Sequence, residues 1–165
     1  MSKTSAARPL PYSGRSKRAV SDQGVVRVSG HSFVTLLGLP TSDVAGLRER
    51  IQEGLTYRSW DRFLESTGLS NEAVIQVVQI TPRTLARRKS EGRLRPDESD
   101  RLVRAARIFS LAIDLFDGDV EAARRWLTQP QPALGGSTPW DYAATEIGSR
   151  EVENLIGRLE YGIPS

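Results

Sequence analysis

Apolar residues recur every three or four positions from residue 32 to the end of the chain, and Gly, Pro and hydroxyl residues interrupt the pattern at short intervals. This is the periodicity of amphipathic helices, and no stretch shows the strict alternation of a half-buried strand. The pattern therefore predicts an all-α fold. Helices are expected at residues 32–38, 42–53, 56–67, 71–78, 82–91, 97–116, 119–127, 138–146 and 149–160.

Two consecutive helices near the middle of the chain are short and are separated only by a tight turn around Gln79 and Ile80. Thr81 can cap the second of them, with Pro82 at the first helical position, where an N–H group would have no partner in any case. This arrangement is typical of a helix-turn-helix.

The second of these helices opens the most basic part of the chain, because residues 83–95 contain six Lys and Arg and one acidic residue. At about 100° per residue, Leu85 and Ala86 lie on the face expected to pack, and Lys89 falls on that side too. A solvated charged face is one interpretation of such a run. The other is a recognition helix whose cations reach guanine edges and phosphates. In that case the DNA-binding residues are Thr81, Arg83, Thr84, Arg87, Arg88 and Arg93.

The longest expected helix, 97–116, has an apolar arc of roughly 220°, whereas a helix resting on one core needs a little over 100°. Such a helix must be covered from two sides. It can bridge the two halves of the monomer, it can be the central core helix of one domain, or it can form the seam of a homodimer. The residues expected in such a seam are Ile108, Leu111 and Leu115.

Charge divides the chain into parts with opposite sign. Residues 1–30 carry 6 basic and 1 acidic side chain, whereas residues 117–165 carry 4 basic and 8 acidic ones. A basic tail and a basic centre beside an acidic C-terminal third suggest a polyanion partner for one half and a different partner for the other. Residues 1–30 have few large aliphatic side chains and are expected to be a disordered arm, with a short extended piece at 25–28.

The composition argues against several kinds of chemistry. The chain has no Cys and one His, which excludes disulfides, thiolate metal sites and a Cys nucleophile. His31 has no nearby ligand pattern and is expected to be a helix-cap or surface residue. Asp117 and Asp119 lack the further ligands of a calcium loop. We therefore expect no enzyme activity, no cofactor and no metal.

No apolar run is long enough to span a membrane, and the N-terminus lacks the continuous apolar segment of a secretory signal. A cytoplasmic location is expected.

From residue 54 to its end, the chain contains a series of short motifs whose order and spacing are typical of one known family. The matching residues are the RTLARRKSEGRL run at 83–94, Glu98 to Leu102, Ala122, Trp126, Leu127, Pro130, Leu134 to Gly136, Pro139, Thr145, Glu146, Gly148, Val152, Leu155, Glu160 and Gly162. Each piece is short, but together they cover about two thirds of the chain and resemble the antitoxins of the Xre/MbcA/ParS group, which partner RES-domain toxins.

The resemblance implies an Xre/Cro-like helix-turn-helix domain followed by a small helical toxin-binding domain. It implies an antitoxin that dimerises, inactivates an NAD⁺-degrading RES toxin by covering its active site, and represses their shared operon by binding operator DNA. We therefore expect a disordered arm at 1–30, a helix-turn-helix domain at 31–95 and an antitoxin domain at 96–165.

Toxin contacts are expected among C-terminal residues that an ordinary core does not explain. Trp126 and a stripe of Val152, Leu155, Ile156 and Leu159 are expected in the core, because large apolar residues at helical spacing usually pack. The tail from residue 161 is expected to lie in or beside the toxin cleft. The residues expected to contact the toxin are Trp140, Tyr142, Arg158, Glu160, Tyr161, Gly162, Ile163, Pro164 and Ser165.

A second function fits the same pattern. The chain can be a stand-alone transcriptional regulator whose acidic C-terminal domain serves dimerisation or the sensing of a small ligand. The two functions can be distinguished by experiment. An antitoxin should co-purify with the product of a neighbouring gene and rescue growth when that product is expressed, whereas a stand-alone regulator should do neither.

Overall fold

The computed structural model describes residues 32–40 and 44–162, and the regular structure of these residues is helical. None of the helices in these ranges is both long and apolar enough to cross a membrane. The all-α prediction is confirmed. The helices are α1 (Phe33–Leu36), α2 (Val44–Glu53), α3 (Tyr57–Thr67), α4 (Asn71–Val78), α5 (Pro82–Glu91), α6 (Pro96–Leu115), α7 (Val120–Thr128), α8 (Pro139–Tyr142) and α9 (Glu146–Glu160), with one 3₁₀ turn (Pro132–Leu134) before α8.

The predicted basic arm, its extended piece at 25–28 and His31 lie outside the described residues.

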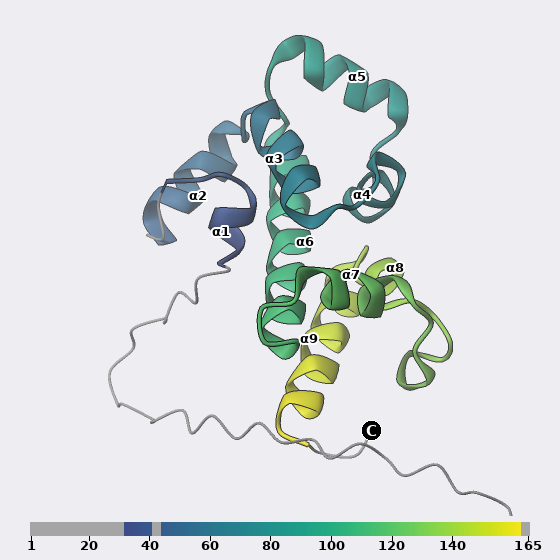
Figure 1. Ribbon diagram of the computed structural model, residues 1–165. Helices are drawn as coiled ribbons and strands as arrows, with labels where there is room; N and C mark the ends of the chain where they lie inside the picture. The colour runs from purple at the N-terminus through teal and green to yellow at the C-terminus, as the bar shows by residue number, and fades with distance from the viewer. Residues whose placement is uncertain (1–31, 41–43, 163–165) are drawn as a thin grey trace, which may run out of the picture.

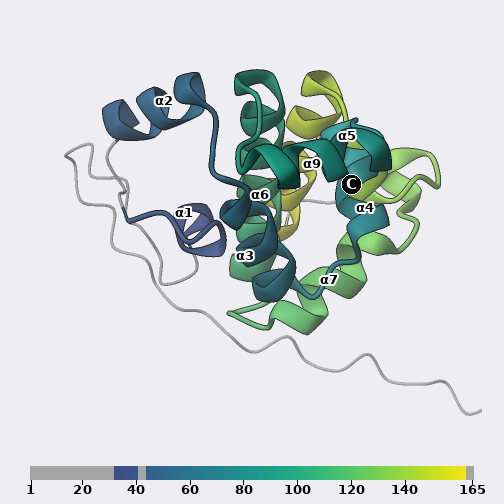
Figure 2. The same ribbon diagram turned by 90° about the horizontal axis from the view of Figure 1, so that it is seen from above.

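Helix α6 is the axis of the molecule (Figure 1). It contacts α1, α2, α3 and α4 as well as α7 and α9. Seen from above, α1 and α2 lie on one side of α6, and α4 and α7 lie on the other (Figure 2). The chain itself therefore covers α6 from two sides, as a bridge between two halves or the central helix of one core would require.

The burial of α6 corrects one residue of the predicted homodimer seam. Ile108 is fully buried within the chain itself, so its side chain is not available to a second copy. Leu111 and Leu115 are partly buried against the same core, and their place in a dimer stays a prediction.

An aromatic cluster joins the two halves of the core. Phe63 of α3, Phe109 of α6 and Trp140 of α8 have ring centroids 6.2 to 6.4 Å apart. The indole N–H of Trp140 donates to the backbone carbonyl of Ala73 at 2.9 Å. Since Trp140 is only 2% exposed, its prediction as a toxin contact is wrong. Its apolar ring and its polar N–H are both satisfied inside the chain.

The boundary between the last two helices lies earlier in the chain than predicted. Helix α8 ends at Tyr142, and α9 begins at Glu146 because the Thr145 hydroxyl accepts a hydrogen bond from the N–H of Gly148 at 3.0 Å. A Cβ at Gly148 would lie 1.8 Å from the carbonyl oxygen of Tyr142. A glycine is thus required for α9 to start directly against α8.

Candidate functional sites at the two ends of α6

The α4–α5 pair is built by the local signals that the sequence contains. Gln79 ends α4 in the left-handed conformation, with φ of 56°. The Thr81 hydroxyl accepts a hydrogen bond from the N–H of Thr84 at 3.1 Å, and Pro82 takes the first helical position. The predicted start of the second helix of the pair is confirmed.

The outward face of α5 carries two cations. Arg83 and Arg87 are exposed, and Ala86 and Ser90 lie beside them. Among the described residues, Arg83 has no ion-pair partner, and Arg87 is 3.9 Å from Glu91 with both side chains at least half exposed. An exposed pair at that distance is weak. We call Arg83, Ala86, Arg87 and Ser90 the basic face.

Arg88, predicted to bind DNA, faces inward and is only 2% exposed. Its Nε and Nη2 donate to the two carboxylate oxygens of Glu98 at 2.7 and 2.9 Å, and its Nη1 donates to Glu91 at 2.8 Å. The prediction that Arg88 contacts DNA is therefore wrong. Instead, this bidentate pair fastens α5 to the first turn of α6.

The buried pair also changes the titration of both partners. The hydrogen bond to Glu98 is the main reason why the pKa of Arg88 lies above its usual value. Burial alone would raise the pKa of Glu98. Hydrogen bonds from Arg88 and from the backbone N–H of Arg95, together with the charge of Arg88, hold that pKa below its usual range. Both groups are therefore charged at neutral pH.

Because Arg88 faces inward, α5 is rotated about its axis relative to the orientation that its sequence predicted. Lys89, expected on the packed side, is exposed, and so is Ala86. Leu85 is buried as expected. The helix packs through Leu85 and Arg88, since Glu98 gives the inward guanidinium a partner that a helical wheel does not show.

Arg93, predicted to contact DNA, is exposed but is already used by the fold. Its Nη1 donates to the carbonyls of Gly54 at 2.7 Å and Glu53 at 3.2 Å. The N–H of Leu94 donates to the carbonyl of Leu55 at 2.8 Å. A Cβ at Gly54, whose φ is +85°, would lie 2.1 Å from the carbonyl oxygen of Leu94. These contacts hold the end of α5 against the start of α3.

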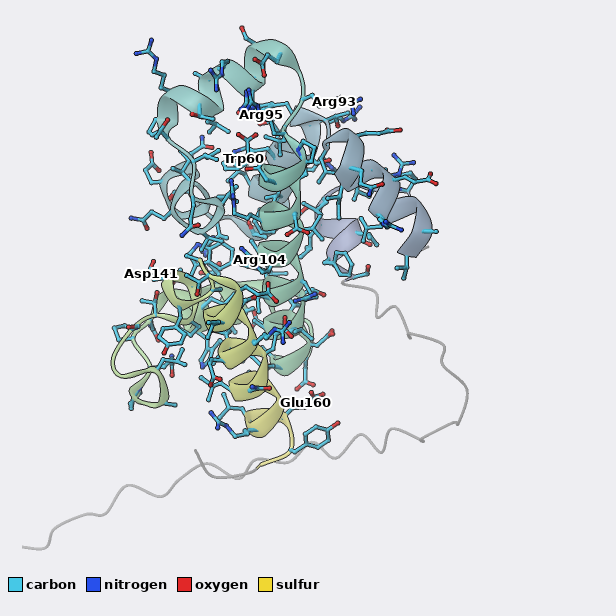
Figure 3. The ribbon with its side chains drawn as sticks, turned by 180° about the vertical axis from the view of Figure 1, so that it is seen from behind. Trp60, Arg93, Arg95, Arg104, Asp141 and Glu160 are labelled. Carbon is cyan, nitrogen blue, oxygen red and sulfur yellow. The ribbon has the colours of Figure 1, made fainter. Side chains whose placement is uncertain are left out.

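The far end of the molecule presents a different set of side chains. Figure 3 shows Arg93 and Arg95 near α5, and Glu160 at the opposite end, beyond the length of α6. Tyr161 is 80% exposed there, and Glu160 and Gly162 are exposed as well. Tyr142 lies on α8 and is 38% exposed.

The remaining C-terminal candidates divide into two groups. Ile163, Pro164 and Ser165 lie outside the described residues. Arg158 is half-buried, and its Nε has no hydrogen-bond partner among the described residues.

Comparison with known proteins identifies two family domains in this chain. The model of the Antitoxin Xre-like helix-turn-helix domain matches residues 46–107, and the model of the Antitoxin Xre/MbcA/ParS C-terminal toxin-binding domain matches residues 111–162. Antitoxin Xre of Photorhabdus laumondii subsp. laumondii is 34% identical over 140 residues, which cover 84% of this chain and 95% of that protein. The chain belongs to the Xre family of antitoxins.

Two further relatives carry the same name. Antitoxin Xre of Yersinia enterocolitica is 35% identical over 77% of this chain and 86% of its own length. Antitoxin Xre of Pseudomonas putida is 38% identical over 51% of this chain and 54% of its own length. The resemblance identified in the sequence is confirmed.

In this antitoxin the two matched modules meet inside α6, because the first match ends at residue 107 and the second starts at residue 111. One continuous helix therefore carries the end of the helix-turn-helix module and the start of the toxin-binding module.

Sequence reasoning missed two surface residues of the toxin-binding module. Leu159, expected in the core stripe of α9, is 39% exposed, and Ile147 in the first turn of α9 is 79% exposed. Val152, Leu155 and Ile156 are buried as expected. The helical spacing of Leu159 is that of a core residue, so the pattern gave no signal of its exposure. The exposure of Ile147 could have been predicted, because it follows the charged Glu146 in the first turn of α9.

Proposed function

We propose that this antitoxin neutralises a RES-domain toxin that degrades NAD⁺, and that it represses the operon encoding both proteins. In this proposal the C-terminal module covers the toxin's active site, and the helix-turn-helix binds the operator. The observation that carries the proposal is that the basic face of α5 and the exposed end of α9, one in each matched module, lie at opposite ends of α6 (Figure 1). A 20-residue helix is about 30 Å long, so both partners can be bound by separate surfaces.

DNA binding is supported by the exposed cations of α5. Arg83 and Arg87 extend from a helix whose capped N-terminus is exposed at Thr81. A helix N-terminus and guanidinium groups both favour phosphate oxygens, and arginine also binds guanine edges in the major groove. We propose that Thr81, Arg83, Thr84 and Arg87 contact the operator.

Toxin occlusion is supported by the exposed end of α9. Tyr161 is the most exposed large apolar residue of the described chain, and the tail to Ser165 continues from it. In this proposal the active site of the toxin is a cleft that binds NAD⁺. We propose that Glu160 and residues 161–165 enter or border that cleft.

The experiment is co-expression of the full chain with the product of the neighbouring gene. The antitoxin function predicts co-purification, rescue of growth and loss of NAD⁺ turnover in the complex. A stand-alone regulator would bind its operator but would neither co-purify with that neighbour nor rescue growth. Deletion of residues 161–165 tests the tail separately, because full neutralisation by the shortened chain would eliminate occlusion by the tail.

A further inference from the structure

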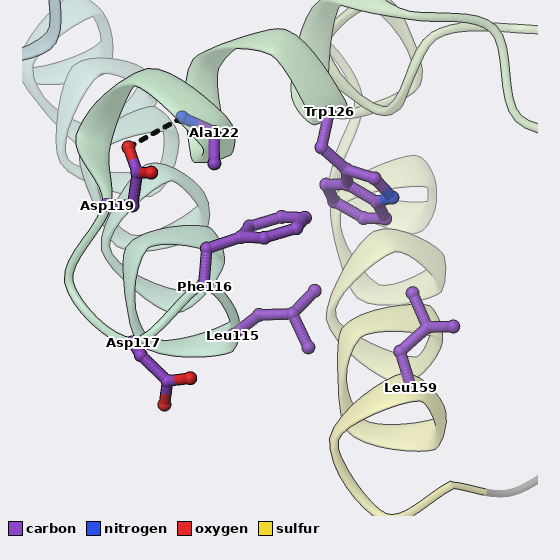
Figure 4. A pocket seen from close by; sticks show the side chains of 7 residues that line it. All are labelled: Leu115, Phe116, Asp117, Asp119, Ala122, Trp126 and Leu159. Carbon is purple, nitrogen blue, oxygen red and sulfur yellow. Dashed lines mark hydrogen bonds between the residues drawn. The ribbon is translucent and has the colours of Figure 1, made fainter. Parts of the chain in front are cut away.

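An open groove lies at the C-terminal end of α6, where α6, α7 and α9 meet. Its volume is about 430 Å³, and we call it the acidic groove. Figure 4 shows the rings of Phe116 and Trp126 and the side chains of Leu115 and Leu159 around the same space. The lining residues are Leu115, Phe116, Asp117, Asp119, Ala122, Trp126 and Leu159.

The floor of the groove is apolar and only partly covered by the chain itself. The rings of Phe116 and Trp126 are 6.3 Å apart and tilted by 54°. Both are partly buried, and Leu159 on the facing helix is 39% exposed. Aromatic side chains in a partly covered pocket are the residues that most often dominate binding energy at a protein interface.

The rim of the groove is negative. Two carboxylates, those of Asp117 and Asp119, line the groove, and no basic side chain is among its lining residues. Asp117 is exposed, and its carboxylate forms no hydrogen bond or ion pair with another described residue. One carboxylate oxygen of Asp119 accepts from the N–H of Ala122 at 2.9 Å. The C-terminus of α6 adds a partial negative charge at the same place.

An apolar floor with acidic residues at its rim favours some binding partners over others. Nucleic acid is disfavoured, because the rim would repel phosphates. A second copy that met this groove with its own groove is disfavoured as well, since Asp117 would lie close to another carboxylate. Leu115 lines the groove, and its place in a dimer seam stays a prediction. A protein segment with apolar residues next to Lys or Arg satisfies both the floor and the rim.

We propose that the acidic groove is a docking site for an amphipathic, basic segment of the cognate toxin, with an apolar side chain between Phe116, Trp126 and Leu159 and a cation at Asp117. The inference rests on the proposed toxin-binding function. All residues of the groove fall within the matched toxin-binding module at 111–162. The groove is distinct from the tail at 161–165, so it supplies affinity rather than occlusion of the active site.

The first test compares two apolar-to-charged substitutions on the same helix. Leu159→Arg introduces a cation into the groove, whereas Ile147→Arg introduces one at an exposed site near the other end of α9. We expect Leu159→Arg to weaken toxin binding by about tenfold or more and Ile147→Arg to change it by less than about threefold, measured by calorimetry. Asp117→Lys should slow association, whereas Asp141→Lys, at an exposed residue of α8, should not.

The second test observes toxin binding by the unsubstituted chain, and a variant serves only to assign one resonance. The three tryptophans are replaced by 5-fluorotryptophan, and ¹⁹F spectra are recorded with and without unlabelled toxin. The Trp126 resonance, assigned from Trp126→Phe, should shift, whereas the buried Trp60 and Trp140 should change little. If the chain binds the toxin while Trp126 does not respond and Leu159→Arg binds normally, the groove proposal is wrong. If the chain binds no toxin at all, the proposed function fails first.

Discussion

The two ends of α6 differ in how the fold uses their carboxylates. At its start, the carboxylate of Glu98 is buried and neutralises an inward arginine, so that the other cations of α5 remain outward. At its end, Asp117 and Asp119 remain at the surface beside an apolar groove. The net charge of a segment therefore does not locate a binding surface. Its location depends on which charges the fold pairs internally.

The largest expected effect concerns the buried pair at the start of α6. Glu98→Ala leaves the guanidinium of Arg88 buried with only Glu91 as a partner, and we expect it to lower the free energy of unfolding by about 3–5 kcal/mol. Urea denaturation measures this loss. Glu91→Ala is the matched control, because Glu91 is half exposed and its removal should lower stability by about 1 kcal/mol or less. Equal losses in the two variants would contradict the locking role of Glu98.

A steric change tests the start of α9, in the toxin-binding module. Gly148→Ala would place a methyl group against the carbonyl of Tyr142, and we expect a loss of about 1–3 kcal/mol in unfolding free energy. Toxin binding should weaken with it, because α9 can no longer start at its present position. Gly157→Ala on the same helix meets no atom within 4 Å. It should leave stability unchanged or raise it by about 0.5–1 kcal/mol. A neutral Gly148→Ala would show that α8 and α9 are not closely packed.

Removing cations from the basic face should affect only DNA binding. Arg83→Ala or Arg87→Ala should each weaken operator binding by about 1–3 kcal/mol, and each lost phosphate contact should reduce the salt slope of the affinity by about 0.9. Arg125→Ala on exposed α7 is the control and should leave operator binding unchanged. Titrations at several salt concentrations measure both quantities. Loss of toxin neutralisation in the Arg83 variant, with its fold intact, would contradict the separation of the two ends.

Lowering the pH should gradually remove the stability that Glu98 contributes at the start of α6. Because the pKa of Glu98 is lowered in the folded chain, its contribution to stability is present above the unfolded pKa of about 4.3 and is lost as the pH falls through the folded value. The difference in unfolding free energy between the wild type and Glu98→Gln should therefore shrink from pH 7 to pH 3. A difference that stays constant over this range would mean that the Glu98 carboxylate contributes no charge-dependent stability.

Local features of the sequence were sufficient to predict most of the fold. The caps at Ser70 and Thr81 accept hydrogen bonds from the nearby backbone, so α4 and α5 begin where predicted. The errors depend on partners distant in the chain. Trp140 is buried because it reaches Ala73, which is 67 positions away. A helical wheel contains no information about such a contact.

The candidate sites were predicted less completely for the same reason. The outward direction of Arg83 and Arg87 follows from the helix itself, whereas the inward direction of Arg88 requires Glu98 from another helix. The acidic groove is assembled from three helices and a turn, and no single stretch contains its pattern. The family resemblance identified the toxin-binding module, but it could not indicate which of its faces is open.

We propose that operator and toxin are bound by separate surfaces at opposite ends of α6, a helix about 30 Å long. It is tested most directly by adding the neighbouring gene's product to the antitoxin already bound to operator DNA and measuring the mass of the species in solution. We predict a ternary complex that contains DNA, antitoxin and toxin together. Displacement of the DNA by the toxin, with only binary complexes observed, would contradict the claim.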